Sequence, residues 1–348
     1  MDISKIDKNM IIETKINRPR IKFFDIDDEP FRIYGIWRDG DRYYRIPSEV
    51  SKNVSKNVHE MCANTAGGRV RFVTDSSYVA ISAELDALYT LSFMPFSGTL
   101  GLDVYADGEF AGSYRPPLEI ENNSFESVVD LGERRKRVIT IHTPLYCDLK
   151  KLYVGIDAEA CLERAPDYKY EKPIVYYGSS ITNGACCSRP GLTYESQISR
   201  MLDANHHNLG FGGSAKAEVE MAEYIAGLDM SVFVYDYDHN APTPEYLAQT
   251  HERMFKIIRD ANPTLPIVMI SRPKYYSDPD RDRRFEVIKE TYDRAVASGD
   301  KNVYILRGSD FFDEVGGDYT IDGTHPTDLG FYFMARGIAP ILKKILES

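Results

Sequence analysis

The stretch Ile174-Val175-Tyr176-Tyr177-Gly178-Ser179-Ser180-Ile181-Thr182-Asn183-Gly184 decides how this chain is organised. Its first four residues are apolar or aromatic and predict a buried strand, which glycine and small polar residues then end abruptly. A serine directly after a buried strand lies where open α/β sheets place their reactive groups. The same serine would also serve as a turn residue or a helix cap. Catalysis therefore requires partners elsewhere in the chain: a base, an acid that orients the base, and donors for an oxyanion.

Short apolar runs alternate with amphipathic segments throughout the second half of the chain. Strands are expected at 174–177, 207–209, 232–235, 267–270 and 303–306, and helices at 194–202, 215–225, 244–259, 281–297 and 330–346. Alternation of this kind predicts a parallel sheet of five strands with helices on both faces.

The first half of the chain has a different pattern, with short strands separated by turns. Strands are expected at 31–37, 42–47, 69–74, 78–83, 102–105, 110–114 and 137–142, and one short helix between residues 48 and 63. Asp107-Gly108 separates two of these strands and is a typical hairpin turn. This half is therefore predicted to be an all-β sandwich or jelly roll, with the domain boundary between residues 165 and 166.

Composition excludes several classes of partner. The formal net charge of -11 disfavours nucleic acid and anionic membranes as binding partners. No segment has the roughly 20 consecutive apolar residues that a membrane helix needs. Five cysteines without metal-ligand spacing, and a first segment without a signal-peptide pattern, lead us to expect reduced thiols in a cytoplasmic protein.

A carboxylate and a histidine three residues apart stand near the C-terminus, in Asp322-Gly323-Thr324-His325-Pro326. At this spacing Asp322 can accept from one ring nitrogen of His325, which leaves the other nitrogen free to take a hydroxyl proton. A helix cap beside an unrelated histidine explains the same residues equally well.

Two further loops offer hydrogen-bond donors. Residues 208–214 end one strand and open a helix, and their glycines, Gly213 among them, let backbone N–H groups approach a ligand. Residues 236–242 follow the third strand, and Asn240 there could donate a side-chain N–H to the same oxygen. Asp236, Asp238 and His239 in this loop are also candidate metal ligands, although their crowding favours a structural loop.

Taken together, Ser180, Gly213, Asn240 and His325 resemble the four sequence blocks of the SGNH (GDSL-type) hydrolases. The resemblance covers the second half of the chain and implies a flavodoxin-like, three-layer α/β domain. It also implies Ser180, Asp322 and His325 as catalytic residues, an oxyanion hole from Ser180, Gly213 and Asn240, and no metal or organic cofactor. An α/β-hydrolase fits worse, because its nucleophile turn needs glycine where Thr182 stands.

The chain departs from the family pattern at two positions. Ser179 replaces the usual aspartate before the nucleophile, and Asp238-His239-Asn240-Ala241 replaces the usual Gly-x-Asn-Asp. The assignment of Asn240 therefore rests on less than that of Ser180 or His325.

The first half carries a resemblance of its own. Gly101-Leu102-Asp103-Val104-Tyr105 resembles the GxDLY signature of β domains that precede some SGNH domains, and residues 45–47 and 66–72 look similar to other parts of such domains. A jelly roll joined to an SGNH domain is similar to bacterial carbohydrate acetyl esterases. This resemblance implies a small-molecule or oligosaccharide ester, such as an O-acetyl ester, as substrate.

The hypothesis is a serine esterase that works through an acyl-enzyme. Three alternatives stay open at this point: an acyltransferase that uses a sugar or metabolite hydroxyl as acceptor, a metal-dependent hydrolase, and a carbohydrate-binding module on an inactive hydrolase. The sequence leaves open the acyl group, the sugar, the role of the β domain and whether the chain forms a homo-oligomer.

Overall fold

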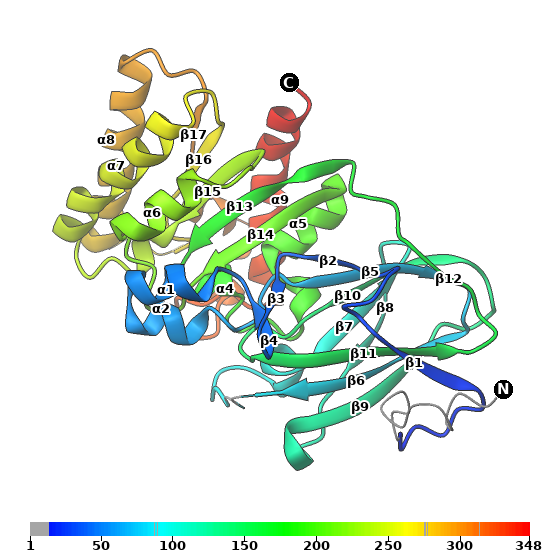
Figure 1. The fold of residues 1–348 in the computed structure, drawn as a ribbon. Coiled ribbons are helices and arrows are strands. Elements are labelled where there is room, and N and C mark those ends of the chain that lie inside the picture. Colours follow the sequence, from blue (N-terminus) through cyan, green and yellow to red (C-terminus); the bar gives the residue numbers. More distant parts are fainter. Residues whose placement is uncertain (1–13, 87, 89, 275, 277, 313) are drawn as a thin grey trace.

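The central sheet of the second half has five parallel strands, as expected. The computed structural model describes residues 14–348 except 87, 89, 275, 277 and 313. The strand order is β14-β13-β15-β16-β17 (Figure 1). Numbered along the chain this order is 2-1-3-4-5, the flavodoxin-like order, and it confirms the predicted fold class. The strands span Tyr170–Gly178 (β13), Ala204–Gly210 (β14), Val232–Asp236 (β15), Ile267–Ile270 (β16) and Val303–Leu306 (β17).

Helices cover both faces of this sheet because the strands are apolar on both faces. In β13, Ile174 and Tyr176 belong to one core cluster and Val175 and Tyr177 to the other. The first cluster includes α5 (Tyr194–Leu202) and α9 (Asp328–Leu346). The second includes α6 (Val219–Ala226), α7 (Pro244–Ala261) and α8 (Pro279–Ala297), on the opposite face in Figure 1.

Two expected helices differ from the structure. The helix predicted from residue 215 begins only at Val219, because Ala217 has a left-handed backbone with φ of 53° that an α-helix cannot contain. The single helix predicted between residues 48 and 63 is two short ones, α1 (Ser48–Val54) and α2 (Lys56–Met61). Ser55 is extended between them, and its side chain accepts from the Val58 N–H to cap α2.

The first half is a sandwich of two antiparallel sheets, which confirms the expected β domain. One sheet has the order β1-β11-β6-β9, and the other β12-β5-β10-β7-β8 with β2 beside β5. Both sheets contribute to one core, in which Phe72, Ile81 and Val154 are fully buried. The strands span Ile21–Asp25 (β1), Arg32–Tyr34 (β2), Arg69–Thr74 (β5), Tyr78–Leu85 (β6), Leu102–Ala106 (β7), Glu109–Tyr114 (β8), Ser124–Asp130 (β9), Arg137–His142 (β10), Leu149–Asp157 (β11) and Leu162–Glu163 (β12), with the short helix α3 at Phe96–Thr99.

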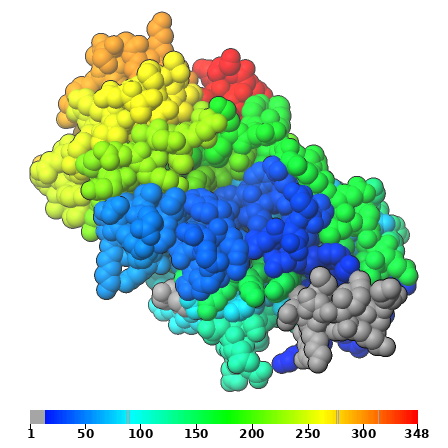
Figure 2. Space-filling model, viewed as in Figure 1, coloured from blue at the N-terminus to red at the C-terminus, as the bar shows by residue number. Residues whose placement is uncertain are grey.

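The expected strands at 31–37 and 42–47 are shorter and lie in two places. Gly35, with φ of 75°, ends β2 and turns the chain into a separate hairpin of β3 (Trp37–Asp39) and β4 (Arg42–Tyr44). After this hairpin the chain crosses to the α/β domain, where α1 packs against α6. Ile46, Val58 and Cys62 share a core cluster with Phe211 and Met221. Figure 2 shows these blue segments of the first half lying against the green and yellow α/β domain. The boundary expected at 165/166 lies in the connection from β12 to β13 and stays a prediction.

Asp103, from the GxDLY-like segment, joins the two domains. Its fully buried carboxylate accepts from His142 Nδ1 at 2.8 Å, from Arg189 Nη1 at 2.8 Å and from the Gly191 N–H at 2.9 Å. Burial alone would raise the pKa of Asp103, but these charged and polar partners outweigh it and the pKa is lowered. The aspartate therefore holds the loop before α5 against the β domain as an ion.

None of the helices in the described part of the chain is long and apolar enough to cross a lipid bilayer. The cellular location expected from the sequence stays a prediction.

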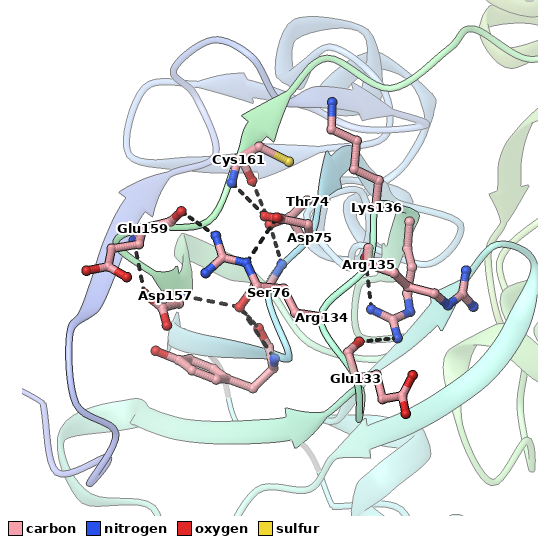
Figure 3. Close-up of polar contacts among 12 residues, drawn as sticks. Thr74, Asp75, Ser76, Glu133, Arg134, Arg135, Lys136, Asp157, Glu159 and Cys161 are labelled. Carbon is pink, nitrogen blue, oxygen red and sulfur yellow. Dashed lines mark hydrogen bonds and ion pairs between the residues drawn. The ribbon is translucent and has the colours of Figure 1, made fainter.

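A second carboxylate holds the connection between β11 and β12 (Figure 3). Asp75 accepts from Arg134 Nε at 3.0 Å and from the Cys161 N–H at 2.7 Å, and Arg134 also donates to the Glu159 carbonyl. Hydrogen bonds from Arg134 first, and then from Cys161, lower the pKa of Asp75 to about 2.

This shift predicts an acid-sensitive contribution to stability. The folded pKa of Asp75 lies below the ordinary value of 3.8, so its stabilisation is present above pH 3.8 and is lost as pH falls through about 2. Asp75→Asn should lower Tm at pH 7 by about 2–4 °C for each 1 kcal/mol of interaction lost. The difference from wild type should shrink at pH 2–3, as measured by thermal unfolding. An equal difference at both pH values would contradict the prediction.

Candidate active site

The segment after β13 forms a tight turn that presents Ser180. Gly178 ends the strand, and a Cβ there would lie 1.7 Å from Asp236 Oδ1, so only glycine fits. Ser179 then caps the short helix α4 (Ser180–Asn183), and its hydroxyl accepts from the Ile181 N–H at 3.1 Å. Ser179 therefore supplies a hydrogen bond to this turn, at the position where the family usually has aspartate.

Ser180, His325 and Asp322 form one hydrogen-bonded chain. Ser180 Oγ lies 2.8 Å from His325 Nε2, and His325 Nδ1 lies 2.7 Å from Asp322 Oδ2. Asp322 Oδ1 also accepts from the backbone N–H groups of Thr324 and His325, at 2.9 and 2.8 Å. The structure thus brings these three side chains together, although Ser180 and His325 are 145 residues apart in the sequence.

The environment keeps Asp322 ionised. Burial opposes the charge, but hydrogen bonds from the His325 N–H, the His325 ring and the Thr324 N–H outweigh it and lower the pKa. A carboxylate on Nδ1 fixes the histidine tautomer, so that Nε2 is the nitrogen that can take the serine proton.

Three N–H donors belong to residues that line the same cavity as Ser180 and His325. Gly213 has φ of 70°, which glycine adopts without strain, and its N–H donates no hydrogen bond to any described residue. The Ser180 N–H is likewise unused within the described part of the chain. Asn240 Nδ2 donates to the Phe211 carbonyl at 2.9 Å, which leaves its second N–H for a ligand. The predicted oxyanion donors therefore lie around one cavity.

That cavity has a volume of about 400 Å³, and both domains line it. The α/β domain contributes Ser180, Gly212, Gly213, His239, Asn240, Thr324 and His325, whereas Met61, Leu91, Phe93 and Tyr146 come from the first half. Phe93 stacks on the His325 ring with centroids 5.6 Å apart and planes at 9°, and Tyr146 Oη donates to the Ser180 carbonyl at 3.3 Å. Sequence reasoning missed these four residues of the β domain.

The carboxylates considered as metal ligands have other partners. Asp236 accepts from Thr182 Oγ1 at 2.5 Å and from Tyr194 Oη at 3.3 Å, and burial raises its pKa to about 8. Asp238 accepts from the Arg272 N–H at 3.1 Å. Among the described residues no group of three or more histidine, cysteine or acidic side chains could hold a metal ion. Asp236 instead supports the turn beneath the nucleophile.

An arginine of the β domain holds the glycine loop. Arg45 is fully buried, and its Nη1 donates to the Gly210 carbonyl at 2.7 Å while Nη2 donates to the Met61 carbonyl at 2.9 Å. Its guanidinium also lies 4.8 Å from the ring centre of Phe211. One planar group therefore fixes the start of the loop that carries Gly213 relative to α2.

Comparison with known families places this geometry in a class. Residues 171–343 match the model of the GDSL-like lipase/acylhydrolase family, and residues 21–162 match that of GxDLY, the N-terminus of SGNH hydrolase-type esterases. The chain therefore belongs to the SGNH (GDSL-like) hydrolases that carry an N-terminal GxDLY domain. No curated protein matches the chain.

Solved structures share the fold over nearly the whole length. A protein assigned as a GDSL-like lipase from Bacteroides ovatus is 28% identical with a TM-score of 0.84, covering 94% of this chain and 98% of that one. The salicylyl-acyltransferase SsfX3 from a tetracycline biosynthetic pathway is 21% identical with a TM-score of 0.76, over 93% and 98% of the two chains. A family two carbohydrate esterase from Clostridium thermocellum in complex with cellohexaose is 14% identical with a TM-score of 0.60, over 81% and 93%. The last two likenesses are of fold alone.

Loss of the Asn240 amide should slow the chemical step. Asn240→Ala is expected to lower kcat by about 10²–10³-fold with little change in KM, because the amide is needed most when the oxyanion forms. Steady-state kinetics on 4-nitrophenyl acetate measure this effect. Asn262→Ala removes an amide that bonds the Ala226 carbonyl away from the cavity and serves as the control. An unchanged kcat in Asn240→Ala would remove Asn240 from the oxyanion site.

Arg45 should act through the glycine loop. Arg45→Lys keeps the charge but cannot reach both carbonyls as a planar fork, so kcat should fall by about 10–10²-fold with KM nearly constant. Arg69→Lys is the matched control, since Arg69 bonds His206 on the same strand but further from Gly213. Equal losses of kcat in the two variants would show a general effect on stability instead.

Proposed function

We propose that this member of the family is a serine esterase that removes O-acetyl groups from carbohydrates through an acyl-enzyme. The observation that carries the proposal is the hydrogen-bonded chain Ser180–His325–Asp322 at a cavity that Gly213 and Asn240 also line. No cofactor is needed for this chemistry.

The mechanism follows from the contacts. His325 Nε2 takes the proton as Ser180 Oγ attacks the ester carbonyl, and Asp322 stabilises the imidazolium that forms. The N–H groups of Ser180 and Gly213, together with Asn240, hold the oxyanion. His325 then protonates the departing sugar oxygen, and the same histidine activates the water that hydrolyses the acetyl-serine.

Support for a carbohydrate ester comes from the architecture and from the mouth of the cavity. Phe93 covers the outer side of the His325 ring with its own side chain 36% exposed. An exposed aromatic face beside the nucleophile suits the apolar face of a sugar ring. The carbohydrate esterases with similar two-domain folds agree with this choice.

Acyl transfer is the second candidate, and the apolar wall of the cavity favours it. Met61, Leu91 and Phe93 line the space around the serine, where they limit the access of water to an acyl-enzyme. A sugar or metabolite hydroxyl would then replace water as the acceptor.

One experiment tests both candidates. Acetylated xylo- and cello-oligosaccharides and 4-nitrophenyl acetate are incubated with wild type and with Ser180→Ala, and released acetate is measured. Wild type should release acetate from the sugars, and kcat of Ser180→Ala should be lower by about 10⁶-fold. Added methanol should yield methyl acetate in excess of acetate only for a transferase.

Full activity in a folded Ser180→Ala protein would overturn the serine mechanism. If wild type hydrolyses 4-nitrophenyl acetate but none of the acetylated sugars, the carbohydrate assignment is overturned and the assignment as an esterase stands.

A further inference from the structure

A second cavity lies between the β domain and the C-terminal end of α5. Its volume is about 390 Å³. Its lining includes Arg71 of β5, Tyr105 of β7, Thr140 and His142 of β10, Tyr168 from the segment before β13, and Arg200 of α5. No lining residue is shared with the cavity at Ser180. It is therefore a separate site, and the esterase mechanism makes no use of it.

Two arginines in this cavity form no ion pair with any residue that the structure describes. Arg71 is 7% exposed, and its Nε and Nη1 are buried without a hydrogen-bond partner, as is Nη1 of Arg200. Within the described residues neither guanidinium donates a hydrogen bond or forms an ion pair. Arg45, Arg69 and Arg189 nearby each donate to protein oxygens. The difference is notable because buried charges in proteins are normally paired.

Aromatic rings hold the two guanidiniums in place without satisfying them. Arg71 lies 4.0 Å from the ring centre of Tyr168, and Arg200 lies 4.1 Å from that of Tyr105. Such stacking orients a guanidinium, but a ring face provides no acceptor for the in-plane N–H groups. The donors are therefore positioned and unoccupied by the protein.

The carboxylates around the cavity are committed elsewhere. Asp103 is saturated by His142, Arg189 and the Gly191 N–H. Asp107 pairs with Arg135 at 2.9 Å and accepts from the Val138 N–H, and Asp203 accepts from the Lys169 N–H. Two unpaired cations in one cavity of a chain with a net charge of -11 indicate that the missing negative charge comes from a ligand.

We propose that this cavity binds a small organic anion through a carboxylate or phosphate group that Arg71 and Arg200 contact together. His142 adds an acceptor, because its Nδ1–H is held by Asp103 and burial lowers its pKa, which leaves a neutral Nε2. The tyrosine rings offer flat surfaces to the body of the ligand. A hydroxylated organic acid or a phosphorylated sugar has this combination of groups.

The test uses the full chain and two probes, sodium phosphate and sodium succinate, against sodium chloride at equal ionic strength. Thermal unfolding and calorimetry should show a saturable rise in Tm and 1:1 binding for at least one probe. Arg71→Gln and Arg200→Gln should each lose this response. Without the anion, Arg71→Gln should unfold at a Tm no lower than wild type, because it removes an unpaired buried charge.

Two controls separate this site from other effects. Arg135→Gln removes an exposed arginine at the rim that is already paired with Asp107, and it should keep the response. Ser180→Ala should also respond as wild type does, whatever its effect on esterase activity. If a glutamine variant does not fold, Arg200→Lys keeps the charge without the planar fork and should weaken binding by about tenfold or more.

Each outcome decides the proposal. A response to phosphate alone assigns a phosphate group, a response to succinate alone assigns a carboxylate, and a response to both supports their shared chemistry. The proposal is overturned if neither probe gives a saturable response. It is also overturned if the response persists in both arginine variants, or is lost equally in Arg135→Gln.

Discussion

The rest of the molecule depends on one constraint, the edge of β14 that no other strand pairs. Among the described residues β14 pairs only with β13, so one side of its backbone has no hydrogen-bonded strand. The carbonyls of His206, Asn208 and Gly210 point to that side, and they accept from Arg69 at 2.9 Å and from Arg45 at 3.4 and 2.7 Å. Open edges invite pairing with other chains, and here two buried arginines of the β domain occupy the edge instead.

This arrangement makes the two domains one functional unit. Arg45 bonds the last carbonyl of the strand that continues into the glycine loop, so the position of this loop relative to Ser180 depends on a contact from the other domain. Asp103 ties the loop before α5 to the β domain in the same way. Four side chains of the first half then complete the cavity around the serine. The shape of the cavity around Ser180 therefore depends on how the two domains pack against each other.

Sequence patterns predicted the α/β half well and the β half less completely, for physical reasons. Strands buried on both faces and long amphipathic helices have strong signals, and the expected elements of the second half lie within a few residues of those observed. In the β domain the expectations omitted β1, β9, β11 and β12. A register shift between Leu149 and Lys151 breaks the two-residue period of β11, which hides the strand in the sequence. The missed helix boundary at Ala217 reflects a backbone conformation that residue type does not reveal.

The same reasoning explains what could be found at the site. Ser180, Asp322 and His325 were predictable because each stands in a short motif whose chemistry is local. Met61, Leu91, Phe93 and Tyr146 were not, since their place depends on how two sheets of different type dock. Arg45 lay in a segment singled out for its resemblance, yet only the docked strand shows what its guanidinium holds.

Because both domains build the cavity around Ser180, its reactive groups and its apolar wall belong to different parts of the chain. The α/β domain holds Ser180, His325 and Asp322, whereas the β domain supplies the apolar wall of the cavity around the serine. Residues 90–95 of the β domain take no part in the hydrogen bonds that join Ser180, His325 and Asp322. The wall of the cavity can therefore change in shape while the hydrogen-bonded chain of Ser180, His325 and Asp322 stays as it is.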